Sequence, residues 1–392
     1  MHRLPDIHLV SAGYRRRQNG QIESGSELQM LRVGLLGFGY ASQTFHAPLI
    51  QAVPGLELTA VSSSDPSKVH QTLGSDVKVY GDAAALIATA DVDLVVIATP
   101  NLTHHALAHA ALLAGKHVVV DKPFTSNADE AEELVCLAQA QDRHLSVFHN
   151  RRWDSTALTV RQLLQDQVLG PIRHARLHFD RYRPQPRVRW REAAAEGGGL
   201  WMDLGPHLLD EALRHFGRPD AIQLDLALLR PGAQIDDHFQ AVLRYADGLR
   251  VTLHASNVSA VPGPRIELHG LKGSYVKRGV DQQEDSLKAG LRPQVGNLQE
   301  WGVDPDQGEL VILEGATLVR RAFPTERGAY PEYYRQIRDL LLGNGSNPVP
   351  PEEALDVMRL LDLGIASART RCEVTCQTSA DARDQRATHP AA

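Results

Sequence analysis

From residue 31 to residue 149, short apolar runs alternate with stretches in which apolar positions have a helical spacing. Short apolar runs bounded by turn residues favour strands that are buried on both faces, as in a parallel sheet. The predicted strands are Leu31–Leu36, Leu56–Ser62, Val77–Tyr80, Leu94–Ala98, His117–Val120 and His144–Phe148. The clearest helical stretches are Thr103–Leu113 and Asn127–Ala140. This order predicts right-handed crossovers and a doubly wound parallel sheet of the α/β class.

In the second part of the chain the predicted strands follow one another with fewer helices between them. They are Ile172–Tyr182, Ile222–Leu229, Phe239–Tyr245, Leu249–Ala255 and Arg265–His269. Asp247-Gly248, between two of these strands, is a hairpin signal. Helical stretches at Tyr330–Leu342 and Pro351–Ser367 follow. The pattern predicts a C-terminal α+β domain.

Both ends of the chain lack this periodicity. Residues 1–30 show no sustained pattern, and Met30 stands directly before the first strand, so we expect an extension that is disordered or not native. Residues 372–392 are small, polar and charged, and we expect a disordered tail there. Between the two ends we predict two domains, at residues 31–149 and 150–371.

The composition limits the partners and the location. Of the 392 residues 43% are hydrophobic and the net charge is −6, so nothing points to nucleic acid or to a membrane surface. No apolar stretch approaches the ~18 residues that a membrane span needs, and no apolar segment of a secretory signal follows the arginines at 15–17. The three cysteines, Cys136, Cys372 and Cys376, do not form a disulfide framework. These features favour a reducing cytoplasm, and we expect no metal site.

The first predicted strand runs directly into a glycine-rich turn. Gly37 permits a tight turn, and Gly39 lets the backbone approach a pyrophosphate at the N-terminus of the following helix. Ser42 takes the third position of the G-x-G-x-x-G pattern and is small enough for close packing. We predict a dinucleotide site whose loop residues are Gly37, Phe38, Gly39, Ala41 and Ser42.

The end of the second strand bears on the choice of cofactor. Proteins that prefer NAD usually place an acidic residue there, to accept hydrogen bonds from the ribose. This chain has Ser63 and Ser64 instead, with Lys68 one turn later, and Asp65 is placed to cap the next helix. Two hydroxyls and an ammonium favour the 2′-phosphate of NADP over NAD. The alternative is a serine-rich turn without cofactor preference.

Lys122 follows the valine run 118–120 and precedes Pro123. Proline forces the preceding residue into an extended conformation, and the carboxyl ends of the strands form the ligand crevice of such a sheet. We therefore expect the Lys122 side chain to reach a substrate oxygen. The alternative is a surface lysine before a turn.

Three polar residues with helical spacing follow the glycines at 197–199. Asp203, His207 and Asp210 would lie on one face of a helix, and Pro206 suggests that this helix begins near Asp203. A carboxylate beside His207 would orient the imidazole as the acceptor of a substrate proton. The alternative makes Asp203 a helix cap and His207 a core histidine with satisfied hydrogen bonds.

These motifs, taken in order, resemble one known family. The stretches are Thr99-Pro100-Asn101-Leu102-Thr103-His104, Ala114-Gly115-Lys116-His117, Asp121-Lys122-Pro123 and Asp203-x-Gly205-x-His207-x-x-Asp210. They are similar to those of the glucose–fructose oxidoreductase, inositol dehydrogenase and rhizopine-catabolism (Gfo/Idh/MocA) family, over roughly residues 31–368. Members usually have Glu where this chain has Asp121.

The resemblance implies an activity, a set of site residues and a second domain. Lys122, Asp203 and His207 become the catalytic set, Asp210 a ligand of a substrate hydroxyl, and the Lys122–Pro123 bond is expected to be cis. Further cofactor contacts are implied for Thr99, Pro100, Asn101, His104, Asp121 and Lys122. The family's second domain has an open, mainly antiparallel sheet that often mediates oligomers, so a homodimer or homotetramer is expected.

A narrower likeness is to the NADP-dependent scyllo-inositol 2-dehydrogenase subgroup. The stretches that carry it are 149–154, 181–184, 189–192 and 279–285. The arginines of residues 181–191, with Tyr182 and Trp190, are expected to staple a loop, to contact another subunit or to enclose substrate. Nucleic acid is not expected, because the chain is acidic.

The expected function is therefore that of a cytoplasmic NAD(P)-dependent oxidoreductase. It would interconvert a secondary alcohol and a ketone on a cyclic polyol or sugar, with scyllo-inositol and NADP as the first choice. An aldose or anhydro-sugar reductase is the alternative enzyme. The alternative from another class is a regulatory protein that senses NADP without catalysis, against which the joint presence of Lys122, Asp203 and His207 argues.

Overall fold

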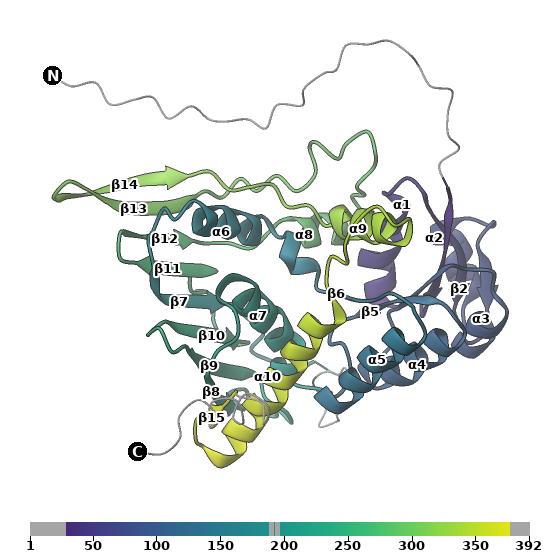
Figure 1. Ribbon diagram of the computed structural model, residues 1–392, viewed down its shortest axis with the longest axis horizontal. Helices are drawn as coiled ribbons and strands as arrows, with labels where there is room; N and C mark the ends of the chain where they lie inside the picture. Colours follow the sequence, from purple (N-terminus) through teal and green to yellow (C-terminus); the bar gives the residue numbers. More distant parts are fainter. Residues whose placement is uncertain (1–28, 188–191, 193–196, 377–392) are drawn as a thin grey trace, which may run out of the picture.

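The computed structural model describes residues 29–187, 192 and 197–376. It contains a parallel sheet with its helices and a larger, mainly antiparallel sheet, which lie side by side (Figure 1). The α/β class and both sheet types are confirmed. The extension at residues 1–28 and the chain beyond residue 376 lie outside the described residues, so the expectations for them stay predictions.

The parallel sheet has six strands in the order β3-β2-β1-β4-β5-β6. The strands are β1 (Leu31–Leu36), β2 (Leu56–Ser62), β3 (Lys78–Tyr80), β4 (Leu94–Ile97), β5 (His117–Asp121) and β6 (Leu145–Phe148). Each coincides with a predicted strand to within one residue at either end. The strand order reverses between β1 and β4, and ligands bind at such a switch point in open α/β sheets.

Three of the helices of this sheet begin at a side-chain cap. The helices are η1 (Ser42–His46), α1 (Ala47–Gln51), α2 (Pro66–Leu73), α3 (Ala83–Thr89), η2 (Asn101–Thr103), α4 (His104–Leu113) and α5 (Ala128–Ala140). At the starts of α2, α3 and α5, the side chains of Asp65, Asp82 and Asn127 each accept a hydrogen bond from the amide three residues later. The capping role predicted for Asp65 is therefore confirmed.

The second sheet has nine strands in the order β14-β13-β12-β11-β7-β10-β9-β8-β15. They are β7 (Ile172–His178), β8 (Ala221–Ala227), β9 (His238–Arg244), β10 (Arg250–Ser256), β11 (Ile266–Gly270), β12 (Gly273–Lys277), β13 (Gly308–Glu314), β14 (Thr317–Phe323) and β15 (Val374–Thr375). All pairs are antiparallel except β7 with β10. The sequence predicted the central strands and missed β12 to β15.

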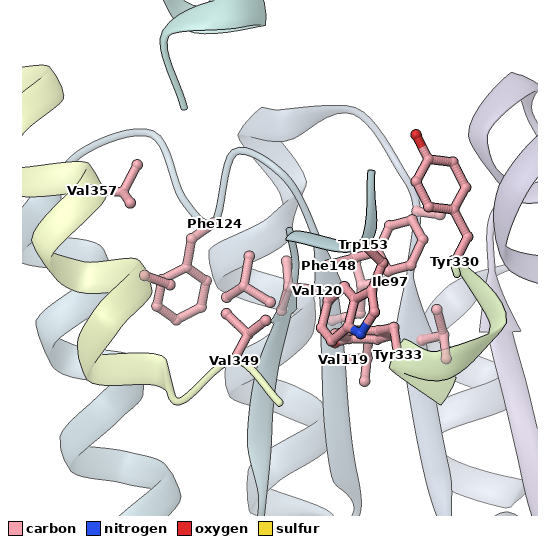
Figure 2. Packing of buried hydrophobic residues seen from close by; sticks show 14 of the residues in the cluster. Ile97, Val119, Val120, Phe124, Phe148, Trp153, Tyr330, Tyr333, Val349 and Val357 are labelled. Atoms are coloured by element: carbon pink, nitrogen blue, oxygen red, sulfur yellow. The ribbon is translucent and has the colours of Figure 1, made fainter. Parts of the chain in front are cut away.

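Among the helices of the second part, α10 (Pro351–Thr370) packs against elements of both sheets. The others are η3 (Asn150–Trp153), α6 (Ser155–Gln165), α7 (Leu200–Phe216), α8 (Gln283–Lys288) and α9 (Pro331–Leu341). Helix α10 packs on β8 and α7, and also on α5 and β6 of the other sheet. Val357 of α10 lies near Phe124, and Phe148, Trp153 and Tyr333 pack against one another (Figure 2). One continuous apolar core therefore spans both sheets.

Two expectations about boundaries were wrong. Helix α7 begins at Leu200, so Pro206 lies inside it and not in its first turn. The reason is a cap from a distant segment, because the Trp201 amide donates to the Asp236 carboxylate at 2.7 Å. The tail was expected to be disordered from residue 372, but Val374 and Thr375 pair with β8 and extend the sheet.

Loss of this cap gives a test of the fold. Asp236→Ala is expected to lower the free energy of unfolding by about 0.5–2 kcal/mol, because the first turn of α7 loses an acceptor. Urea unfolding followed by circular dichroism measures the change. Asp236→Asn keeps an acceptor and should stay near the parent protein. Equal stabilities of the alanine variant and the parent would show that this cap does not stabilise α7.

Within residues 29–376, masked positions aside, no helix has the length and the apolar character required to cross a membrane.

Candidate active site

The glycine-rich turn after β1 has the geometry of a phosphate-binding loop. Gly37 has a φ of 82°, and a Cβ added there would lie 3.1 Å from the carbonyl oxygen of Ala98, so only glycine fits. A Cβ added at Gly39 would meet no atom within 4 Å, which leaves room for a pyrophosphate beside the backbone. Ser42 Oγ donates to the Gly37 carbonyl at 2.8 Å. The Gly37 amide donates to Ser62 Oγ at 3.0 Å, a contact that the sequence did not suggest.

The end of β2 places two serines and a lysine near the predicted adenosine side. Ser63 Oγ accepts from the Asp65 amide at 3.1 Å, which shapes the turn. Ser64 and Lys68 are exposed, and within the described part of the chain the Lys68 ammonium makes no ion pair. The Asp65 carboxylate in this turn accepts from the Lys68 amide at 3.0 Å, and in the described part of the chain no carboxylate pairs with the Lys68 ammonium.

His104 joins the tips of β4 and β5. Its Nδ1 lies 2.8 Å from the Pro123 carbonyl oxygen, and its Nε2 lies 3.0 Å from the Thr99 carbonyl oxygen. Burial lowers its pKa although both carbonyls act in the opposite direction. The enclosed side chain thus links the segment that begins at Thr99 to the tip of β5.

Asn101 begins η2, the short helix between β4 and α4. Asn101 is buried and its Nδ2 donates to the Gly197 carbonyl at 3.4 Å. The contact links the tip of β4 to the glycines before α7. Pro100 and Asn101 therefore stand where the two parts of the chain meet.

Asp121 at the end of β5 is an anion. Burial alone would raise its pKa, but His46 and Lys122 outweigh that effect and lower the pKa to about 2. His46 Nε2 lies 3.7 Å from Asp121 Oδ1, and the Lys122 amide donates to that oxygen at 2.9 Å. The Lys122–Pro123 bond is cis, as expected.

The Lys122 side chain crosses to the second part of the chain and contacts α7. Its Nζ donates to the Asp203 carbonyl oxygen at 2.8 Å and lies 3.3 Å from Asp203 Oδ1. Arg181 approaches the other carboxylate oxygen at 3.4 Å. Lys122 and Asp203 were predicted to belong to one site, and the structure brings them together.

His207 lies one turn beyond Asp203 on α7. Its exposed fraction is 6%, and burial, with the nearby charge of Lys122, lowers its pKa well below 6.5. The imidazole is therefore neutral at pH 7 and able to accept a proton. Within the described residues, Asp203 makes its hydrogen bonds to Lys122 and Arg181 rather than to His207. The expectation that Asp203 orients His207 is thus not met by the geometry.

Asp210 faces a different neighbour from the one expected. Arg152 Nε lies 3.1 Å and 3.0 Å from its two carboxylate oxygens, and a second nitrogen of the guanidinium lies 2.5 Å away. Burial would raise the pKa of Asp210, but Arg152 lowers it. Asp210 is absent from the described lining of the cavity that holds Lys122 and His207. Its placement favours a supporting role, through Arg152, over direct contact with a substrate.

A cavity of about 470 Å³ contains the predicted catalytic set. Asp121, Lys122, Asp203 and His207 line it together with Ala41 of the glycine loop. Its other described lining residues are Tyr40, Phe45, Phe148, Asn150, Arg151, Arg181, Arg183, Arg187, Leu204, Glu284 and Lys288. Several of these stand in the stretches that carried the narrower likeness, whereas no pattern in the sequence marked Phe45, Phe148 or Lys288.

The arginine cluster contributes to this cavity. Arg181, Arg183 and Arg187 are among its lining residues, while Arg189, Trp190 and Arg191 lie outside the described residues. Arg230 holds the loop that follows β7 in place, a role that the sequence did not suggest. Its guanidinium donates to the carbonyl oxygens of residues 183 and 185 at 3.0 and 3.2 Å, and it pairs with the carboxylates of residues 192 and 237.

Comparison with known proteins agrees with this geometry. Residues 31–149 match an oxidoreductase family with an NAD-binding Rossmann fold, and residues 157–276 match a GFO/IDH/MocA C-terminal domain. The uncharacterized oxidoreductase YdgJ of Escherichia coli is 52% identical over 342 residues, which cover 87% of this chain and 97% of YdgJ. The chain therefore belongs to the Gfo/Idh/MocA family of oxidoreductases.

Two further relatives extend the comparison. The scyllo-inositol 2-dehydrogenase (NADP(+)) IolW of Bacillus subtilis is 32% identical over 347 residues, 88% of this chain and 96% of IolW. The structure of a putative oxidoreductase from Yersinia pestis has a TM-score of 0.85 and 49% identity, and covers 91% of this chain and 100% of that one. The fold and an NAD(P)-binding Rossmann domain are thus shared with solved and curated relatives.

Proposed function

We propose that the protein is an NAD(P)-dependent dehydrogenase that interconverts a secondary alcohol and a ketone on a cyclic polyol or sugar. The observation that carries the proposal is the single cavity in which Lys122, Asp203 and His207 lie beside the glycine loop. The first substrate and cofactor to test are scyllo-inositol and NADP, which the name of the relative IolW suggests.

The residues of the cavity have different roles in this proposed reaction. Bound NAD(P)⁺ supplies the hydride acceptor. His207, neutral at pH 7, takes the proton of the substrate hydroxyl. The Lys122 ammonium stabilises the negative charge that develops on that oxygen, and the Asp203 carbonyl and carboxylate hold the ammonium in place. Asp203 thus acts through Lys122.

The rival readings make different demands on this cavity. A reductase of aldoses or anhydro-sugars would use the same groups in the opposite direction, and a 1,5-anhydro-D-fructose reductase is 26% identical over 277 residues. A sensor of NADP would need the glycine loop alone. The presence of Lys122, Asp203 and His207 in one cavity favours catalysis over sensing.

A screen of purified protein separates these possibilities. NADP⁺ or NAD⁺ is offered with inositol isomers and sugars, NADPH or NADH with the corresponding ketones and aldoses, and the absorbance of the reduced cofactor is followed. If the proposal is correct, the protein oxidises a secondary hydroxyl of at least one polyol or sugar. Tight binding of NADP without turnover of any compound would favour the sensor.

Cofactor choice gives a second prediction. The parent protein is expected to favour NADP over NAD by about tenfold to a few hundredfold in kcat/KM, because Ser63, Ser64 and Lys68 can form charge-assisted hydrogen bonds with a 2′-phosphate. Ser63→Asp should reverse the preference by repelling that phosphate and accepting from the ribose.

Ser63→Ala serves as the matched control for this prediction. It removes the hydroxyl without adding a charge, so it should weaken the preference for NADP without creating one for NAD. A parent protein that already prefers NAD would contradict the assignment of the β2 end, and would leave the catalytic assignment standing.

The setting of the activity is also part of the proposal. Cys136, Cys372 and Cys376 are free thiols, which is compatible with a reducing cytoplasm. We propose a homodimer or homotetramer that is built through the larger sheet, as the family resemblance implies. Analytical ultracentrifugation measures the assembly, and a monomer at micromolar concentration would contradict it.

A further inference from the structure

The cavity that would receive the substrate is lined by more cations than anions. Its described lining includes the basic residues Lys122, Arg151, Arg181, Arg183, Arg187 and Lys288, against the acidic residues Asp121, Asp203 and Glu284. A neutral polyol needs hydrogen-bond donors and acceptors and does not require an excess of one charge. The meaning of the excess therefore depends on which of these cations already form ion pairs with carboxylates of the protein.

Two of the six are held in tight ion pairs. Arg151 lies 2.6 Å from the Glu284 carboxylate and 3.2 Å from that of Asp154. Lys288 lies 2.7 Å from the other oxygen of Glu284. The two distances to Glu284 are those of strong charge-assisted bonds. Burial would raise the pKa of Glu284, but Arg151 and Lys288 lower it to about 2. Arg151 and Lys288 thus have their charge largely compensated.

The cations around Asp203 are paired more loosely. One carboxylate faces both Lys122, at 3.3 Å, and Arg181, at 3.4 Å. Both distances exceed the 2.7–2.9 Å typical of charge-assisted N–H···O bonds. The anion of Asp121 also lies near Lys122, so within the described residues Arg181 is the more loosely compensated of the two cations.

Arg187 adds a further cation to the lining of the cavity. Its side chain is exposed, and within the described residues its guanidinium makes no ion pair, although its amide donates to Glu192 at 2.9 Å. Arg181 and Arg187 both belong to the segment that follows β7, and both line the cavity together with Lys122. A substrate held at Lys122 would therefore occupy the same cavity that these two arginines line.

We propose that the substrate carries an anionic group, a carboxylate or a phosphate, which Arg181 and Arg187 bind. The inference rests on the proposed dehydrogenase activity and narrows it to acidic or phosphorylated polyols and sugars. Guanidinium groups suit this task because they present paired donors that match the oxygens of a carboxylate or phosphate. Neutral inositol should then be a weaker substrate than an inositol that carries a phosphate.

The test compares each neutral compound with its anionic counterpart. The pairs are myo-inositol with myo-inositol monophosphate, and D-glucose with D-glucuronate, each with the preferred cofactor. The parent protein should show a kcat/KM at least about tenfold higher for one anionic member. Arg187→Gln should lower that value by about 10–100-fold and change the value for the neutral member by less than about twofold.

The cofactor phosphates are the other possible source of an anion, and a second measurement separates them. The Kd for NADPH, measured by fluorescence, should be the same in Arg187→Gln and the parent protein. Arg173→Gln, at an exposed arginine of β7 that pairs with Asp247, is the matched control and should change nothing. Equal losses for neutral and anionic substrates, or a weakened Kd for NADPH, would overturn the inference.

Failure of the proposed function stays distinguishable from failure of this inference. If no compound is turned over, calorimetric titration of the protein–NADPH complex with D-glucuronate and D-glucose still measures whether the anion binds more tightly. A clear preference for glucuronate that is lost in Arg187→Gln supports the inference without catalysis. Absence of that preference overturns it, whether or not a neutral polyol is oxidised.

Discussion

Replacing Lys122 with alanine is expected to lower kcat by about 10²–10⁴-fold, the usual contribution of a positioned acid–base or electrostatic group. Its ammonium lies 2.8 Å from the Asp203 carbonyl and points into the cavity that holds His207. The loss should fall on kcat because the ammonium stabilises a charge that is fully developed only in the transition state. Steady-state kinetics with the substrate found in the screen measure it.

Two controls show whether the loss of activity comes from weaker cofactor binding or from a general effect of removing a lysine. The Kd for NADPH should change by less than about twofold, since we expect the phosphates to bind at the glycine loop and the turn after β2. Lys272→Ala, at an exposed lysine between β11 and β12, is the matched control and should keep full activity. Full turnover by Lys122→Ala would remove Lys122 from the catalytic set.

Replacing His207 with asparagine is expected to lower the rate of alcohol oxidation by a similar factor, about 10²–10⁴-fold. Asparagine keeps a polar side chain on α7 but cannot accept the substrate proton. The pH profile adds a readout that a change in packing would not produce. Oxidation requires neutral His207, so activity should rise with pH through the pKa of the imidazole.

The direction of the pKa shift sets where that rise lies. Burial and the charge of Lys122 lower the pKa of His207, so the acidic limb of kcat/KM should fall below pH 6.5. In His207→Asn this limb should disappear from the residual activity. An acidic limb that persists unchanged in the variant would assign the proton acceptor to another group.

The parallel sheet could be predicted because its signals are local. Each strand is a short apolar run, and the glycines at 37 and 39 mark the turn before η1. The edge strands of the larger sheet lack such signals. In β14, Arg320 and Arg321 are exposed next to each other, so no alternation of apolar and polar residues marks it.

The residues of the predicted catalytic set line one cavity, but the sequence did not predict the contacts between them. Spacing along α7 suggested that Asp203 serves His207, because sequence shows neighbours on one helix. The actual partners, Lys122 and Arg181, come from segments 81 and 22 residues away. The same limit applies to Asp210, whose partner Arg152 is 58 residues distant, and to the cap of α7 by Asp236. Long-range pairing of charges depends on the folded topology, and a single sequence does not contain that information in readable form.

The central claim is that these residues support transfer of a hydride from a carbinol carbon to the nicotinamide. The most direct test incubates the protein with NADP⁺ and a polyol that carries deuterium on the carbon to be oxidised, and then measures the mass of the reduced cofactor. The account predicts that the parent protein forms NADPH that contains the deuterium. It predicts that Lys122→Ala and His207→Asn form almost none of this deuterated NADPH. Reduced cofactor without deuterium, or no reduction with any polyol or sugar of either charge class, would contradict it.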